Sequence, residues 1–153
     1  MPLNKYLPEG SLIGTAENRE YISSRSGLER ARAEGKILEA TVTMCDSENY
    51  ALHVDLCGII GIIEREECVY GATTKDIAII TRVGKPVAFK VMQVINDGEK
   101  TIAMLSRREA QRECTDAYLS TLCKGDIIPA KITHFEPFGA FVDIGCGVIS
   151  LLA

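Results

Sequence analysis

Residues 35–43, Gly-Lys-Ile-Leu-Glu-Ala-Thr-Val-Thr, recur later in the chain as residues 125–133, Gly-Asp-Ile-Ile-Pro-Ala-Lys-Ile-Thr. Two further blocks match in the same order: 50–56 with 138–144, and 58–63 with 147–152. The offsets of the three blocks are 90, 88 and 89 residues, and each change of offset falls at a turn. We conclude that the chain contains one structural unit followed by the beginning of a second copy.

Each matched block has the pattern of a β-strand. Apolar residues largely alternate with others over 37–44 and 52–56, and the turn-forming residues 46–49 stand between them. We predict three more strands in the first copy, over residues 59–64, 86–95 and 100–105. Five short strands predict an all-β fold with short helices, namely the five-stranded Greek-key barrel called the OB-fold, together with the start of a second copy.

The connections between these strands are also readable. Asn96-Asp97-Gly98 predicts a hairpin turn, because these residues tolerate positive φ. Residues 73–83 form either a helical turn or an irregular connection. Ser26 with Glu29, and Ser106 with Glu109, have the spacing of a helix capping box. The first helix is expected to end at Gly35 and the second, about 16 residues long, near residue 124.

These elements divide the chain into four parts. Residues 1–13 show no periodicity and are expected to be a loose arm. The predicted parts are an amino-terminal arm with a short helix (1–34), a first OB-fold domain (35–108), a helical connector (109–123) and the first three strands of an incomplete second domain (124–153). An OB-fold without its last two strands leaves apolar edges open. We therefore expect either further chain or a second molecule, as in a dimer, to cover them.

Composition places the protein among soluble globular chains. Hydrophobic residues make up 46% of the 153 and charged residues 25%, with a net charge of −4. The longest apolar runs, such as 59–63, are far shorter than the roughly 18 residues of a membrane span, and no secretion signal opens the chain. We predict a cytoplasmic protein without a membrane partner. The mild acidity argues against gripping duplex nucleic acid by bulk charge, but not against a local groove.

No pattern in the sequence indicates catalysis or a bound metal. The six cysteines contain no Cys-x-x-Cys pair and are interpreted as free thiols, and the two histidines lie outside zinc spacing. Phosphate-loop and nucleophile-elbow motifs are absent from the sequence. Asp55 and Asp143 occupy equivalent places in the repeat and are expected to bond to a turn. We predict a protein that is not an enzyme, with no cofactor and no metal.

Two aromatic residues of the second copy are candidates for binding. Phe138 and Phe141 are three residues apart, so they share a face only if Phe138 lies at the turn, and Gly139 permits that bend. Exposed rings on a curved sheet form a stacking platform for unpaired bases, while Lys131 on the neighbouring strand would meet phosphates. The alternative is that both rings belong to the core. His134 lies at the end of the first strand of this copy, either in contact with RNA or in an exposed loop.

Residues 125–126 and 131–145, with Phe-Gly-Ala-Phe-Val-Asp-Ile-Gly as the specific part, resemble the opening of an S1 domain, an RNA-binding OB-fold module. The resemblance extends to residues 35–108. It implies binding of single-stranded RNA, and repeated S1 modules joined by helices imply a ribosomal protein that acts in translation, by binding mRNA or docking to the ribosome. The alternative that it implies is an RNA-binding appendage of an RNA-processing or RNA-degrading enzyme whose catalytic part lies outside this chain.

The first copy departs from the S1 pattern. Tyr50 and His53 occupy its two aromatic positions, and the glycine between them is replaced by Ala51. Residues 35–123 carry a net charge of −3, which is unfavourable for tracking phosphates. The basic residues nearest to the family's RNA contacts are Lys90, Lys100 and Arg107. The first domain therefore either contacts RNA through Tyr50 and His53 or docks to the ribosome or ribosomal proteins.

Overall fold

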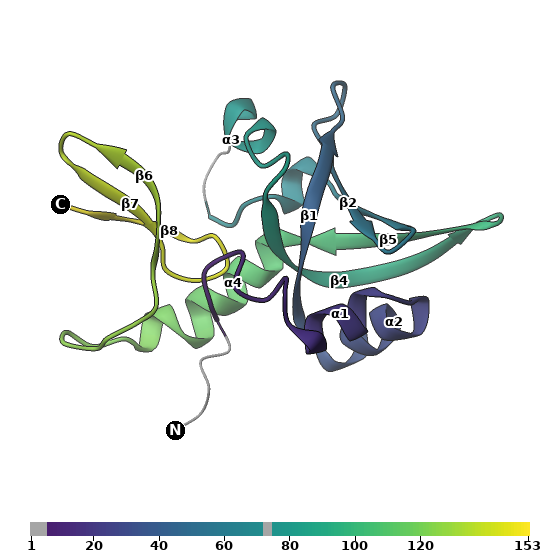
Figure 1. The fold of residues 1–153 in the computed structure, drawn as a ribbon, viewed down its shortest axis with the longest axis horizontal. Coiled ribbons are helices and arrows are strands. Elements are labelled where there is room, and N and C mark those ends of the chain that lie inside the picture. The colour runs from purple at the N-terminus through teal and green to yellow at the C-terminus, as the bar shows by residue number, and fades with distance from the viewer. Residues whose placement is uncertain (1–5, 72–74) are drawn as a thin grey trace.

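The computed structural model describes residues 6–71 and 75–153 (Figure 1). Its largest unit is a closed barrel in the strand order β1-β2-β3-β5-β4. All neighbouring strands are antiparallel except β3 and β5, which run parallel. This is the OB-fold topology, and it confirms the predicted fold class. The strands are β1 (Ile37–Cys45), β2 (Leu52–Leu56), β3 (Ile59–Ile63), β4 (Pro86–Asp97) and β5 (Lys100–Ser106).

Alternation along the strands fills the barrel. Val42, Leu52 and Val54 point inward, with Phe89 of β4 as the largest buried side chain. Because successive residues of a strand face opposite sides, the residues between them lie on the outer surface. Two adjoining turn residues with positive φ, Cys57 and Gly58, connect β2 to β3, and Gly98 (φ 66°) lies in the β4–β5 hairpin.

A second, three-stranded antiparallel sheet lies beside the barrel, with β6 (Lys131–Glu136), β7 (Gly139–Asp143) and β8 (Ile149–Leu152) in chain order. It repeats the register of the barrel, including an irregularity in the first strand. In the barrel, Val42 pairs with Val54 and Met44 with His53, so Thr43 bulges. In the second sheet the bulged residue is Thr133. Individual strand-to-strand residue pairs of the barrel therefore recur at the equivalent positions of the second sheet, as expected of an internal duplication.

Part of the inner face of this second sheet is uncovered, although Ala140 and Val142 on that face are each only 8% exposed. Ile132 is 50% exposed and Leu152 62%, whereas the residues at the same repeat positions of the barrel, Val42 and Ile63, are 1% and 0% exposed. The difference arises because β4 and β5 cover the barrel positions, and no equivalent strands lie over the second sheet among the described residues.

Helices surround the barrel, and three of them differ from the sequence prediction. An additional helix, α1 (Ala16–Ile22), precedes α2 (Arg25–Glu34), and α2 is capped by Ser24 rather than Ser26. Helix α2 ends at Gly35, which has the left-handed conformation, as predicted. Ser106 caps the helix that follows the barrel, but this helix is shorter than expected. The remaining helices are η1 (Arg65–Glu67), α3 (Asp76–Ile80), α4 (Arg107–Ala117) and η2 (Leu119–Thr121).

Residues 6–13 are not a loose arm. They pass between the barrel and the second sheet, where Tyr6 and Glu9 are buried (Figure 1). The carboxylate of Glu39 accepts hydrogen bonds from the backbone of Gly10 (2.9 Å) and Ile13 (3.1 Å), which fixes the segment on β1. Periodicity could not predict this, because the partners lie 26 to 29 residues away. The part of the predicted arm before Tyr6 lies outside the described residues.

No helix in residues 6–71 and 75–153 is long and apolar enough to cross a membrane. Over the same residues, no cluster of three or more histidine, cysteine, aspartate or glutamate side chains has the arrangement of a metal site. The six cysteines are free thiols, of which Cys68, Cys114 and Cys146 are buried.

Candidate RNA-binding surface

The second sheet presents a small aromatic cluster. The rings of Phe138 and Phe141 meet edge to face with centroids 6.2 Å apart, and His134 stacks on Phe141 at the same separation. Phe138 is 61% exposed, so it is not part of a core. His134 Nε2 lies 2.6 Å from the Glu136 carboxylate, an exposed contact that orients the imidazole. The three rings therefore form a continuous surface open to solvent.

Gly139 makes this arrangement possible. It has φ of +153°, and a Cβ at this position would collide with the backbone carbonyl of Leu152. A side chain is therefore excluded both by conformation and by the close approach of β8. The chain bends at this glycine, and Phe138 turns onto the face of Phe141.

The first copy places different groups at the same positions. Met44 and His53 correspond to His134 and Phe141, and Thr43 and Thr133 each donate their hydroxyl to the carbonyl across the ladder, of His53 (3.1 Å) and Phe141 (3.2 Å). Tyr50, the equivalent of Phe138, has φ of 59° and packs against the barrel core, with the Arg65 guanidinium 5.2 Å from its ring centroid. Its ring is therefore partly covered.

On the outer face of the barrel, mainly apolar side chains occupy the region that corresponds to the aromatic cluster of the second sheet. Met44, Ile62 and Met104 lie in one row across β1, β3 and β5, with His53 between Met44 and Ile62. Ile60 and Ile102 form the neighbouring row. We call these residues the apolar row. Acidic residues border the row, namely Asp46, Glu48, Asp55, Glu64 and Glu66.

The two equivalent aspartates bind turns, as predicted. Asp55 accepts one hydrogen bond, from the backbone of Gly58 at 3.0 Å. Asp143 accepts three, from the backbone N–H groups of Gly145, Gly147 and Glu9, between 2.9 and 3.0 Å. Burial raises the pKa of Asp143, and these N–H groups act in the opposite direction.

The predicted basic residues do not gather on one surface. Lys90 forms an ion pair with Glu113 of α4 at 2.9 Å, and Lys100 lies at the exposed tip of the β4–β5 hairpin. Lys131 begins β6, opposite Asp143, and its Nζ lies 3.5 Å from the backbone oxygen of Glu9. Of these three, only Lys131 lies on the same sheet as the aromatic cluster.

Arg107 departs most from its expected role. Its side chain is 6% exposed, donates to both carboxylate oxygens of Glu9 at 2.7 and 2.8 Å, and donates to the backbone oxygen of Cys68 at 3.0 Å. The Nε, Nη1 and Nη2 groups of Arg107 therefore all donate hydrogen bonds within the fold. Arg107 is therefore not presented to RNA, and we do not retain it among the candidate contacts.

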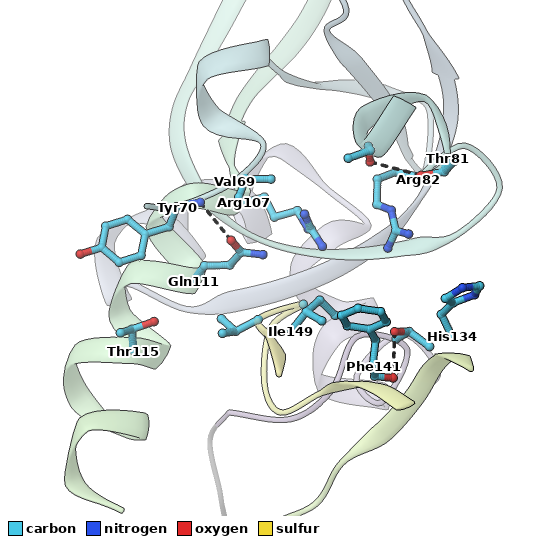
Figure 2. A pocket seen from close by; sticks show the side chains of 14 residues that line it. Val69, Tyr70, Thr81, Arg82, Arg107, Gln111, Thr115, His134, Phe141 and Ile149 are labelled. Carbon is cyan, nitrogen blue, oxygen red and sulfur yellow. Dashed lines mark hydrogen bonds between the residues drawn. The ribbon is translucent and has the colours of Figure 1, made fainter. Parts of the chain in front are cut away.

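A cleft of about 470 Å³ separates the barrel from the second sheet (Figure 2). His134, Phe141 and Ile149 line it from the sheet, and Tyr70 and Arg82 line it from the barrel. Arg82 is a candidate that sequence reasoning missed. It lies in the connection of residues 73–83, where no periodicity or motif indicates a site.

Comparisons with known proteins find relatives in sequence over most of the chain. No family model matches the chain. The chain is 27% identical over 157 aligned residues to the small ribosomal subunit protein bS1 of Mycobacterium leprae, with 94% of this chain covered. It is 26% identical to the protein of the same name from Streptococcus pneumoniae, with 92% covered. The solved structure of GSP13 from Bacillus subtilis matches at 27% identity and a TM-score of 0.42, covering 61% of this chain and 63% of that one.

The barrel and the partial copy in the same register define a protein built from repeated OB-fold modules. In sequence, the chain resembles the S1-domain protein of the small ribosomal subunit over more than nine-tenths of its length. The chain spans about a third of the length of the curated relatives it matches.

Proposed function

We propose that this chain is a non-catalytic S1-type module that binds single-stranded RNA in the cytoplasm, with the aromatic cluster of the second sheet as its main contact. Residues 35–108 would be the first module, residues 109–123 the connector and residues 124–153 the start of the second. The observation that carries the proposal is the edge-to-face pair formed by the exposed Phe138 and the half-buried Phe141. The named relatives are ribosomal proteins, which favours mRNA as the strand.

Stacking explains how a chain of net charge −4 would bind a polyanion. Each base on an aromatic ring contributes about 1–3 kcal/mol, independently of the sign of the protein's charge. Lys131, on the same sheet as the cluster, would provide local positive charge. Because every base has a flat face, we expect little preference for base sequence.

The proposal is tested by fluorescence anisotropy with a labelled single-stranded RNA and a duplex of equal length, at low and moderate salt. We expect tighter binding of the single strand. Phe138→Ala and Phe141→Ala should each weaken it by roughly 5-fold to 100-fold, the equivalent of a lost stacking contact. Binding that the two substitutions leave unchanged would contradict the proposal.

Phe135 offers a matched control. It is an exposed phenylalanine of the same sheet, but it pairs with Ala140, one position along from His134, so it belongs to the opposite face. Phe135→Ala should leave RNA affinity within twofold of the wild type. An equal loss from this variant would mean that aromatic exposure alone, and not the cluster, is being measured.

For the first barrel we propose docking to a protein partner, such as a ribosomal protein, rather than RNA binding. The apolar row with its acidic border supports this, because exposed apolar side chains on one sheet face favour protein contact and the acids repel phosphates. Ile62→Lys should reduce co-sedimentation with small ribosomal subunits and leave affinity for RNA unchanged. Retained co-sedimentation would count against docking through this face.

We also propose that the uncovered part of the inner face of the second sheet associates with a second copy of the chain. Ile132 and Leu152 there are core residues by their repeat positions, and burying them favours association by the hydrophobic effect. Sedimentation equilibrium should give a dimer that Ile132→Asp dissociates. A monomer at every concentration tested would refute this.

A further inference from the structure

The cleft between the barrel and the second sheet has one wall from each copy of the repeat. The sheet provides Thr133, His134 and Phe141, and the barrel side provides Arg82 with Tyr70 and Val69. Figure 2 shows Arg82 extending from the barrel side toward Phe141 and His134, which come from the facing sheet. The volume of about 470 Å³ lies within the range of small-molecule sites. A single nucleotide is therefore accommodated.

Arg82 feels the charges of Glu9 and Asp143, but among the described residues its Nε, which is buried, forms no hydrogen bond. Its backbone, in contrast, is fixed: its N–H donates to Ile79 and its carbonyl accepts from Lys85, both at 3.0 Å. The guanidinium is thus held at the cleft by a rigid turn, and a guanidinium whose Nε–H makes no hydrogen bond within the described structure is a ready donor to an anion.

The carboxylates nearest to Arg82 are already engaged. Glu9 is paired with Arg107 through two hydrogen bonds, and Asp143 accepts three backbone N–H groups. Both carboxylates attract Arg82 through space, but in the described part of the chain neither forms a hydrogen bond or a close ion pair with it. Lys85 and Lys131 line the adjoining hollow together with Arg82 and with these two carboxylates. Basic side chains outnumber acidic ones at this junction by three to two, in a chain whose net charge is −4.

We propose that this cleft binds a backbone phosphate of single-stranded RNA, with Arg82 as the donor and a base of the same strand stacked on Phe141 and His134. The inference rests on the proposed function and deepens it, because a residue of the first copy would complete the RNA surface of the second. A planar guanidinium matches the paired oxygens of a phosphodiester. The adjoining aromatic rings favour a nucleic acid over other polyanions.

The test measures affinity for a labelled single-stranded RNA as a function of salt in wild type, Arg82→Gln and Arg82→Lys. We expect Arg82→Gln to weaken binding about 10-fold or more, since a charged hydrogen bond is lost. The slope of log affinity against log salt should become shallower by about 0.7, the value for one phosphate contact on a single strand. Arg82→Lys should keep the slope and recover part of the affinity.

Arg25→Gln is the matched control, because it removes the same charge from an exposed position at the start of α2. If Arg82→Gln behaves as this control does while the phenylalanine variants lose affinity, the cleft proposal is overturned and the stacking function stands. If Arg82→Gln weakens binding and the phenylalanine variants do not, the cleft stands and the aromatic cluster is excluded. A wild type that binds no RNA overturns both.

A direct readout separates a contact from an indirect effect. The Nε–Hε resonance of Arg82, assigned by its loss in Arg82→Lys, should shift when RNA is added and remain unshifted with the duplex. Polyglutamate of equal charge should not displace the RNA at equal concentration. Equal displacement would assign the cleft to acidic peptides and overturn the proposal.

Discussion

Glu9 and Arg107, 98 residues apart, form a two-point ion pair in the middle of the molecule. Their side chains are each 6% exposed, and the pair joins the amino-terminal segment to the first turn of α4. The backbone N–H of Glu9 also donates to Asp143. Glu9 therefore links the amino-terminal segment, helix α4 and the second sheet. The placement of the second sheet beside the barrel depends on this junction.

Removing one partner of this pair is expected to destabilise the protein strongly. Glu9→Ala leaves the Arg107 guanidinium buried without its carboxylate partner, which should lower the free energy of unfolding by about 3–5 kcal/mol in urea denaturation. Glu20→Ala, which breaks the exposed pair with Arg30, should cost less than about 1 kcal/mol. Equal effects of the two substitutions would contradict the assigned role.

The equivalent aspartates of the two copies should differ in their contribution to stability. Asp143→Ala removes the acceptor of three N–H groups and should lower the free energy of unfolding by about 3 kcal/mol or more, against about 1 kcal/mol for Asp55→Ala. Hydrogen exchange at Gly145 and Gly147 gives the local measurement. Faster exchange at these amides is expected in Asp143→Ala alone; protection that persists would exclude the proposed role.

Glu39 should make stability depend on pH. Burial raises its pKa from 4.5 to about 7, and one of its carboxylate oxygens has no partner in the described structure. The folded protein then holds a proton that the unfolded chain releases, so stability falls as pH rises from about 4.5 through 7. The contribution of this residue is on the order of 2–3 kcal/mol.

The control for this prediction is Glu39→Gln, which keeps an oxygen for the N–H groups of Gly10 and Ile13 but does not titrate. Thermal unfolding between pH 5 and 8 should show a decline in the wild type that is flattened in the variant. A variant with the same pH profile as the wild type would show that another group is responsible.

The aromatic residues of the first copy should matter less for RNA than those of the second. The double variant Tyr50→Ala with His53→Ala is expected to change affinity for single-stranded RNA by less than twofold, because the Tyr50 ring is partly covered by Arg65 and packed on the core. The anisotropy titration used for Phe138 measures this. A loss as large as that of Phe138→Ala would move RNA binding onto the first barrel as well.

Thiol reactivity should divide the six cysteines. Cys57 and Cys123 are exposed and should react quickly with an aromatic disulfide reagent, in a fast phase of two thiols. Burial raises the pKa of Cys68 to about 11, which removes the reactive thiolate at neutral pH. The double variant Cys57→Ala with Cys123→Ala should abolish the fast phase; a remaining fast phase would mean that a buried site opens readily.

Much of the fold is readable from local pattern. The repeat between residues 35–63 and 125–152 located six strands, and turn residues such as Gly98 located the hairpin that follows β4. The sequence also indicated that Phe138 shares a face with Phe141 only if the chain bends at Gly139, although the residues alone left open that both rings belong to the core. Strand periodicity is a short-range property, because the alternation of side chains is set by the backbone of each strand.

What the sequence by itself determined is therefore the OB-fold barrel, the partial second copy and the candidate aromatic pair. Only the tertiary structure decided that residues 6–13 are buried, that Arg107 is paired with Glu9 and that Arg82 faces the second sheet. Each of these depends on contacts between segments far apart in the chain. No local pattern encodes them, because a charged side chain has the same sequence signature whether it meets solvent, a buried partner or a cleft.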